Sequence, residues 1–240
     1  MLPARHARVS RRPVRRLVAE FLLPQRCLVC GRFGAALHAR CVARLPAAEP
    51  PRCLRCWRLG PVTWCECCGV GAPDAPAFDG LRTPFDFSGD ARRAVLEAKF
   101  RGVTALLSPL ARSAAALVRA EWTVEAVVPI PLAHGRHRAR GYNQAEIAAR
   151  EFARCLGVPL DAGRLRRTRE TPPQAGLGAE ARAVNLRDAF AVSVTDSPLP
   201  AGVLLVDDVT TTGATFEAAA RALRASGVRR VYALALARED

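Results

Sequence analysis

The chain has 240 residues, 50% of them hydrophobic, which is enough for one sizeable core and one small extra module. Its apolar stretches are interrupted by Arg, Pro or Gly well before the roughly 20 residues that a membrane span needs, so the sequence excludes a transmembrane helix. The formal net charge is +14, and Lys99 is the only lysine. Charge carried by arginine suits phosphate-bearing ligands or nucleic acid, although an arginine bias also follows genome composition.

Residues 1–23 are expected to form a basic arm followed by a short amphipathic helix. Six arginines precede Leu17, and apolar residues between Val14 and Leu22 recur at helical spacing. The long apolar stretch and small-residue cleavage site of a secretory signal are missing before Cys27. We therefore predict a cytoplasmic protein.

Residues 24–72 form a cysteine-rich segment that we interpret as a double zinc ribbon. Eight of the nine cysteines fall here, and seven of them with one histidine make four pairs separated by two residues. These pairs are Cys27 and Cys30, His38 and Cys41, Cys53 and Cys56, and Cys65 and Cys68. Thiolate and imidazole at this spacing are ligands that zinc prefers. Disulfides are the alternative, but they need an oxidising compartment for which the chain carries no signal.

Sequential pairing predicts two zinc sites: Cys27, Cys30, His38 and Cys41 for one, and Cys53, Cys56, Cys65 and Cys68 for the other. Cross-braced pairing is the alternative, and Cys67 is left over as a free thiol or a substitute ligand. Four protein ligands for each ion indicate closed, structural sites, because catalytic zinc keeps an open position. The segment has few large apolar residues, so metal binding should supply its folding free energy.

The cysteine-rich segment also offers a candidate contact surface. Trp57 is surrounded in sequence by Arg52, Arg55 and Arg58. These side chains predict either a face for protein or nucleic acid or a solvated surface.

After a short stiff linker at residues 72–77, residues 78–240 read as a second domain in which strands and helices alternate. Phe85 and Phe87 predict an edge strand, and a helix carrying Lys99 is expected to follow. A helical apolar face at 106–118 and a buried strand at 124–130 come next. Such alternation predicts an α/β domain with a parallel sheet covered by helices and ligands at the carboxyl ends of the strands.

Two polar stretches in this domain are candidates for ligand contacts. Residues 132–144 are expected to form a basic loop, in which Arg140 suits a pyrophosphate, with a solvated loop as the alternative. The helix that follows places Cys155 in the core by its spacing. Residues 165–190 predict a long loop that is either a lid, with polar side chains such as Gln174, Arg182 and Asn185, or flexible surface.

The most informative stretch is Val203 to Thr215, in which four apolar residues run into Asp207 and Asp208 and then into a hydroxyl-rich turn. The apolar residues predict a buried parallel strand with the carboxylates at its end. Gly213 lets the backbone close around an anion at the start of the following helix. Since two carboxylates would repel that anion, their expected partners are sugar hydroxyls or a divalent cation.

This stretch resembles the PRPP-binding motif of type I phosphoribosyltransferases. The resemblance extends over nearly the whole chain, and the following features together are similar to the ComF family: the cysteine-rich segment, Lys99-Phe100-Arg101-Gly102, Pro129-Ile130-Pro131-Leu132, Arg140 to Gln144, the series Gln174, Leu177, Arg182 and Asn185, and the PRPP motif. His38 departs from the family, which usually has a cysteine at that position. The family includes competence proteins associated with uptake of single-stranded DNA beside a helicase-like partner, and others named for unrelated pathways.

The resemblance implies a phosphoribosyltransferase-like domain that binds PRPP or a phosphoribosyl nucleotide with magnesium. Asp207 and Asp208 would be the catalytic carboxylates that hold the ribose. The substrate-binding residues would be Lys99, Arg140, Thr210, Thr211, Thr212, Gly213, Ala214 and Thr215. The acceptor and turnover stay open, so three functions remain: a transferase, a PRPP or nucleotide sensor without turnover, and an adaptor for single-stranded DNA and protein.

Overall fold

The computed structural model describes residues 25–60, 63–69, 71–72, 75–168, 189–194 and 197–240. The predicted amphipathic helix at residues 1–23 therefore lies outside the described residues, as do Gln174, Arg182 and Asn185 of the predicted lid. Within the described part of the chain, no helix combines the length and apolar character needed to cross a membrane.

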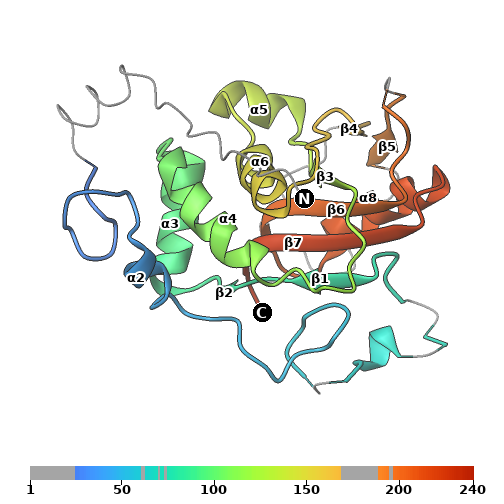
Figure 1. Cartoon of the computed structure of the whole chain (residues 1–240), viewed down its shortest axis with the longest axis horizontal. Helices are drawn as coiled ribbons and strands as arrows, with labels where there is room; N and C mark the ends of the chain where they lie inside the picture. Colours follow the sequence, from blue (N-terminus) through green and yellow to red (C-terminus); the bar gives the residue numbers. More distant parts are fainter. Residues whose placement is uncertain (1–24, 61–62, 70, 73–74, 169–188, 195–196) are drawn as a thin grey trace, which may run out of the picture.

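A five-stranded parallel sheet forms the centre of the molecule (Figure 1). Its strands are β1 (Gly80–Arg82), β2 (Phe85–Asp86), β3 (Ala126–Pro129), β6 (Gly202–Thr210) and β7 (Arg230–Arg238). The order is β1-β7-β6-β3, and β2 continues the edge beyond β1 by pairing with β7 as well. The predicted α/β class, with a parallel sheet and an edge strand near Phe85, is confirmed.

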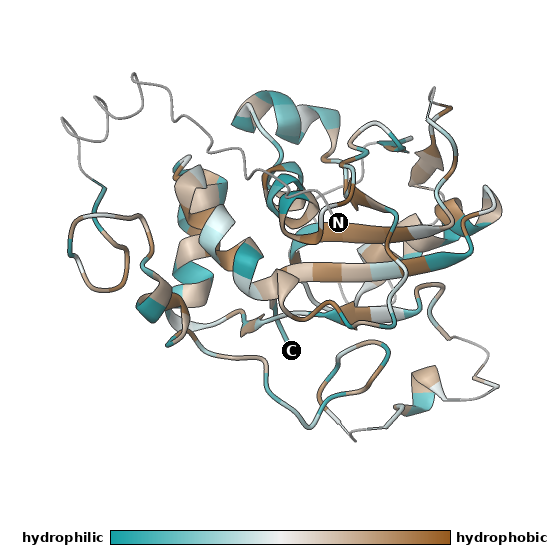
Figure 2. Ribbon diagram, viewed as in Figure 1, coloured by the Kyte–Doolittle hydropathy of each residue, from teal (hydrophilic) through white to brown (hydrophobic). Residues whose placement is uncertain are grey.

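Helices cover both faces of this sheet. One face packs against α3 (Gly89–Phe100), α4 (Leu107–Ala115), which the short η2 (Thr104–Leu106) precedes, and α6 (Gln144–Leu156). The other face packs against α8 (Ala214–Ala225). Side chains of β6 alternate between the two layers: Leu204 and Val206 join the first core, and Val203 and Leu205 the second. Figure 2 shows the apolar strands between these helices.

Three local predictions differ from the structure. A helix, α5 (His134–Arg140), occupies most of the predicted basic loop. The predicted lid is bracketed by an antiparallel pair, β4 (Leu165–Arg167) with β5 (Phe190–Val192). Cys155, predicted to be in the core, is exposed on α6.

The cysteine-rich segment closes the outer edge of the sheet. It contains two short helical turns, α2 (Ala39–Val42) and η1 (Glu66–Cys68). Between them the chain runs beside β1 and β2, where Leu81 N donates to Arg55 O at 2.7 Å and Asp86 N donates to Pro46 O at 3.0 Å. Edge strands otherwise expose unpaired backbone groups that invite pairing with another chain. The segment thus pairs with backbone groups of the β1 and β2 edge.

Candidate functional site

The first metal cluster contains Cys27, Cys30, His38 and Cys41, whose ligand atoms all lie within 4.8 Å of one another. Nδ1 of His38 faces Cys30 Sγ at 3.4 Å, and Nε2 lies 3.2 Å from the carbonyl oxygen of Phe33. A ligating histidine usually donates its second ring N–H to such an acceptor, which fixes the tautomer. The imidazole that replaces a cysteine is therefore oriented as a zinc ligand.

The second cluster contains Cys53, Cys56, Cys65 and Cys68, again with all ligand atoms within 4.8 Å. This grouping follows the predicted sequential pairing rather than a cross-braced one. Cys67 is exposed and is not part of the cluster. Four sulfur atoms at this separation fit a tetrahedral zinc ion, whose Zn–S bonds are about 2.3 Å. Both clusters are consistent with structural zinc.

The first thiol of each cluster is prepared for metal binding. Burial disfavours the Cys27 thiolate, but the backbone N–H groups of Cys30, His38 and Val29 outweigh it and lower the pKa of Cys27 to about 6. In the second cluster, backbone N–H groups likewise outweigh burial and lower the pKa of Cys53 to about 6. Because the thiolate is the metal ligand, each cluster offers an ionised sulfur at neutral pH.

The two clusters repeat one backbone turn. Arg26 pairs with Phe33 across the first turn, and Arg52 pairs with Leu59 across the second. The residue after the second cysteine has positive φ in both: Gly31 at 67° and Trp57 at 59°. This left-handed conformation is unfavourable for a bulky side chain. At Trp57 it directs the indole to the sheet edge, where Nε1 donates to the carbonyl of Thr83 at 3.1 Å.

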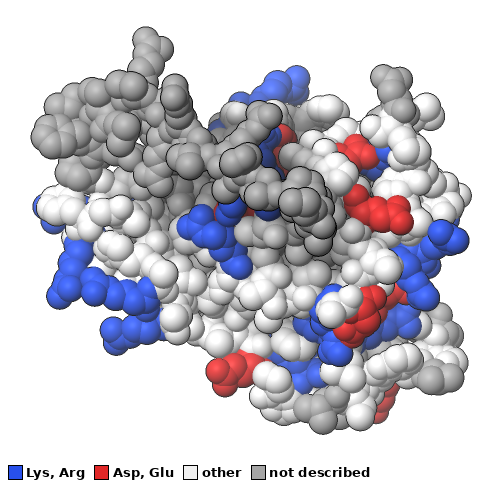
Figure 3. Space-filling model, viewed as in Figure 1, with Lys and Arg blue, Asp and Glu red and all other residues white. Residues whose placement is uncertain are grey.

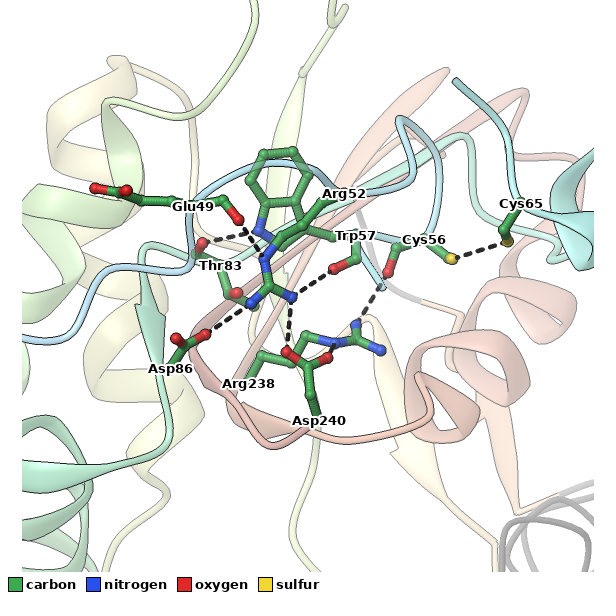
Figure 4. Close-up of polar contacts among 9 residues, drawn as sticks. All are labelled: Glu49, Arg52, Cys56, Trp57, Cys65, Thr83, Asp86, Arg238 and Asp240. Atoms are coloured by element: carbon green, nitrogen blue, oxygen red, sulfur yellow. Dashed lines mark hydrogen bonds and ion pairs between the residues drawn. The ribbon is translucent and has the colours of Figure 1, made fainter. Parts of the chain in front are cut away.

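Arg52 joins the second cluster to the sheet (Figure 4). Its side chain is 2% exposed and forms ion pairs with Asp86 at 2.7 Å and Asp240 at 2.8 Å. It also donates to the carbonyls of Glu49 at 3.2 Å and Trp57 at 3.1 Å. The prediction that Arg52 and Trp57 form a binding face or a solvated surface is therefore wrong, because both side chains dock the metal segment to the sheet edge.

Arg238 makes a second connection between this cluster and the sheet. Its Nη1 donates to the carbonyl of Cys56 at 3.0 Å, and its Nε to Asp240 at 2.6 Å. Arg238 is also the β7 partner of Thr210 in β6. One metal-ligating residue is thus tied to the strand pair that carries the predicted phosphate turn.

Asp207 and Asp208 are the sixth and seventh of the nine residues of β6, because this strand continues to Thr210 rather than ending at the carboxylates. Alternation along the strand places the two side chains on opposite faces of the sheet. The Asp208 side chain lies on the face of the sheet that α3 covers, and its Oδ1 is 3.0 Å from Lys99 Nζ. The Asp208 side chain is 9% exposed and the Lys99 side chain 20%. Lys99, predicted to bind pyrophosphate, therefore neutralises Asp208 in this structure.

Asp207 lies on the other face. Burial and the nearby Asp208 charge raise the pKa of Asp207 to about 7, although Lys99, the Asp208 backbone N–H and Arg167 oppose the shift. Asp207 Oδ1 accepts from that backbone N–H at 2.8 Å. The two carboxylates thus differ: Asp208 is held by a lysine, and Asp207 is near its titration point at neutral pH. Sequence spacing alone did not distinguish them.

The hydroxyl-rich turn connects β6 to α8. Gly213 has φ of 84°, a left-handed conformation that favours glycine, and α8 begins at Ala214. The Thr212 hydroxyl oxygen accepts from Ala214 N at 3.3 Å, whereas the carbonyl of Thr210 accepts from Glu239 N at 2.9 Å. Free N–H groups at the start of a helix favour an anion, so the turn is a candidate phosphate site.

The end of α3 and residues 140–143 are distant in the sequence but meet at the end of the sheet where this turn lies. Arg140 lies over the ring of Phe100 at 5.4 Å, and the Tyr142 hydroxyl donates to the carbonyl of Ala98. Asn143 caps α6 and also donates to the carbonyl of Ile130, next to the end of β3. The end of α3 and residues 140–143 therefore flank the carboxyl ends of β3 and β6, where the resemblance expects pyrophosphate contacts.

Basic side chains are dispersed on the face of the molecule that Figure 3 displays. Figure 3 shows lysine and arginine side chains in several separate groups on the face displayed, some of them beside acidic residues. Ion pairs such as Arg112 with Glu151 at 3.2 Å account for part of the basic charge. A large formal charge alone therefore does not identify a nucleic-acid surface here.

Similarity to known proteins adds independent information. No protein-family model matches the chain. Competence protein F of Haemophilus influenzae is 40% identical over 115 residues, which is 48% of this chain and 50% of that protein. DNA utilization protein YhgH of Salmonella typhimurium is 35% identical over 112 residues, 47% of this chain and 48% of that protein. The matches to these two relatives thus cover about half of their lengths.

YhgH of Escherichia coli K12 is 29% identical over 178 residues, which is 71% of this chain and 77% of that protein. This longer match extends the similarity well beyond a single motif.

Proposed function

This chain is homologous to the ComF-family proteins Competence protein F and YhgH, and on that basis we propose that it binds PRPP with magnesium at the carboxyl end of β6. The observation that carries the proposal is the junction of β6 with α8, where two carboxylates precede a turn whose glycine has positive φ. The names of the relatives favour a role in DNA uptake or use, with nucleotide metabolism as the other pathway open to the fold.

The proposed contacts divide PRPP into three parts. Asp207 and Asp208 hold the ribose hydroxyls, and the turn holds the 5-phosphate through Thr210, Thr211, Thr212, Gly213, Ala214 and Thr215. Lys99 and Arg140 bind the pyrophosphate. For this arrangement Lys99 has to move away from Asp208, with which it forms an ion pair at 3.0 Å. Lys99 thus occupies the position where the ribose hydroxyls would contact this carboxylate.

Magnesium fits the donor set because carboxylate oxygens and phosphate oxygens are the ligands it prefers. When bound, it would neutralise charge on the pyrophosphate leaving group. In a transfer reaction a nucleophile forms a bond to C1 of the ribose while the bond from C1 to pyrophosphate breaks. The carboxylates then stabilise the positive charge that develops on the ribose ring, and the cationic side chains orient the departing oxygens.

Calorimetry of the zinc-loaded protein with PRPP, with and without magnesium, tests the proposed site. We expect saturable binding that the double variant Asp207→Asn with Asp208→Asn weakens at least 10-fold. Asp90→Asn is a matched control, since Asp90 lies at the opposite end of α3 from Lys99. Unchanged affinity in a folded double variant would remove the acidic pair from the site.

A PRPP sensor without turnover is the alternative at the same site. Asp208 and Lys99 form an ion pair, so the charge of this carboxylate is already neutralised without a reacting ligand. Incubation with PRPP, magnesium and a panel of bases separates the two functions: pyrophosphate release supports a transferase, whereas binding without release supports a sensor.

An adaptor for single-stranded DNA and a helicase-like protein is the third candidate, favoured by the net charge of +14 and the relatives' names. Binding through phosphates should weaken with salt, by a slope of about −0.7 for each phosphate contacted. Anisotropy of a labelled oligonucleotide from low to physiological salt measures this slope.

A further inference from the structure

A cavity of about 410 Å³ lies at the amino ends of β1 and β7, between the second metal cluster and the loop before β3. Tyr232 lines it and stands six residues before Arg238, the partner of Thr210. At about 3.3 Å for each residue, the cavity is roughly 20 Å along β7 from the phosphate turn. It is thus separate from the site proposed for PRPP, and its volume is within the usual range for small-molecule sites.

Aromatic side chains form much of this cavity. Trp122 stacks on Tyr232 with ring centroids 4.6 Å apart and planes 10° from parallel. Trp64 also lines the cavity and remains 46% exposed, which is unusual for so large an apolar side chain. An exposed indole beside arginine is a platform on which a nucleobase can stack with little sequence preference.

Arg82 supplies a buried positive charge to the same cavity. It is 5% exposed, and its guanidinium lies 4.6 Å from the ring centre of Trp57 and 5.6 Å from that of Trp122. Its Nη1 donates to the carbonyls of Leu54 at 2.8 Å and Leu81 at 2.7 Å. Burial, followed by the charge of Arg119, lowers the pKa of Arg82 to about 10. The guanidinium is therefore poorly compensated, and a nearby anion would stabilise it.

The acidic residues of the cavity already have partners. Glu121 accepts from Arg119. Asp79 accepts from Arg224 at 2.7 Å and from the backbone N–H of Val231 at 2.8 Å. Among the described residues neither carboxylate forms an ion pair with Arg82, although the charge of Glu121 acts on it at longer range.

We propose that this cavity binds a nucleotide unit, with the phosphate on Arg82 and Arg119 and the base stacked on Trp64. A guanidinium suits phosphate because its planar N–H groups match two phosphate oxygens. The same phosphate and base occur in free mononucleotides and in single-stranded nucleic acid, so the experiment has to separate these sources. The inference does not depend on PRPP binding at β6.

A competing role for Arg82 is to neutralise the second metal cluster. Four thiolates and one Zn²⁺ carry a net charge of −2, and Arg82 donates to Leu54, between two of the cysteine ligands. That role involves neither the exposed ring of Trp64 nor Arg119. Variants of these two residues therefore distinguish a ligand site from a counter-charge.

Intrinsic fluorescence reports directly on the cavity, because the three tryptophans of the chain all line it or contact Arg82. The zinc-loaded full chain is titrated with thymidine monophosphate, thymidine, inorganic phosphate and a twelve-residue oligothymidylate. We expect saturable quenching by the monophosphate, and binding at least 10-fold weaker for thymidine or phosphate alone. Tighter binding of the oligonucleotide would identify single-stranded nucleic acid as the ligand. Equal affinity per nucleotide unit for the oligonucleotide and the monophosphate would identify a free nucleotide as the ligand.

Variants and competition complete the test, with calorimetry as a readout that does not need tryptophan. Trp64→Ala and Arg119→Ala should each weaken binding about 10-fold, whereas Arg150→Ala, which removes a 70% exposed arginine of α6, should leave it unchanged. PRPP with magnesium should not compete. The proposal is overturned if no probe binds at millimolar concentration, if both cavity variants bind normally, or if PRPP displaces the nucleotide.

Discussion

Replacing Arg52 with methionine should destabilise the protein by about 3 kcal/mol. The change removes two ion pairs, to Asp86 and Asp240, and two hydrogen bonds to carbonyl oxygens. Breaking a buried pair by deleting one partner typically costs about 3–5 kcal/mol. We take the lower end because the Asp86 and Asp240 side chains are 41% and 22% exposed and can recover water.

The pH dependence of this variant follows from the carboxylate that it leaves behind. Burial raises the pKa of Asp86, whereas Arg52 lowers it. Without Arg52 the pKa of Asp86 rises further above its unfolded value. Stability is then retained at low pH, where Asp86 is protonated in both states, and is lost as pH rises through the folded pKa. The defect of Arg52→Met should therefore be smaller at pH 4 than at pH 8.

Thermal unfolding in zinc-containing buffer measures the effect. For a chain of this size, about 3 kcal/mol corresponds to a fall in Tm of roughly 6–12 °C. Arg58→Met is the matched control, because Arg58 lies in the same turn but is exposed. A loss below about 1 kcal/mol, or an equal loss in the control, would refute the view that Arg52 holds the metal segment on the sheet.

Two further predictions concern the metal clusters and the acidic pair. Elemental analysis of anaerobically prepared protein should find two zinc ions for each chain, and a thiol reagent should label Cys67 and Cys155 rapidly and the other cysteines after chelation. Less than one equivalent of zinc would contradict both sites, and one equivalent would point to the His38 cluster as defective. Asp207→Asn should raise the free energy of unfolding at pH 8 by roughly 2–4 kcal/mol. The folded protein raises the pKa of Asp207 from 3.8 to about 7, so ionisation of this carboxyl destabilises the native protein as pH rises through that range. Denaturant unfolding of both proteins at pH 5 and 8 checks this, and an equal pH dependence would contradict it.

The features predicted well from sequence depend on local spacing. Two-residue gaps bring both side chains to one ion, so the four ligand pairs, including His38 with Cys41, could be recognised without tertiary information. The structure then showed that the pairs combine sequentially rather than in a cross-braced way. The apolar residues before Asp207 likewise identified a buried parallel strand. In both cases the relevant contacts are formed by neighbours in the chain or by one repeated period.

The features that could not be predicted from the sequence depend on contacts between residues that are far apart in the chain. Arg52 and Asp240 are 188 positions apart, and nothing in their neighbourhoods indicates an ion pair. Trp57 adopts a left-handed conformation that its residue type disfavours, because packing at the sheet edge over-determines the backbone. Helical spacing located α6 but did not show that its last turn is left uncovered at Cys155. Long-range packing, not local pattern, decides these positions.

The cysteine-rich segment also has a consequence for self-association. At the edge strands, Asp86 N donates to the carbonyl of Pro46, in the link between the two metal clusters, and Leu81 N donates to the carbonyl of Arg55, within the second cluster. A chain shortened to begin at Phe78, or stripped of the second metal ion, would present that strand edge to solvent. Such an edge is a template for strand addition, so copies would join through it into polymers or aggregates. Metal depletion of this protein should thus appear first as concentration-dependent light scattering.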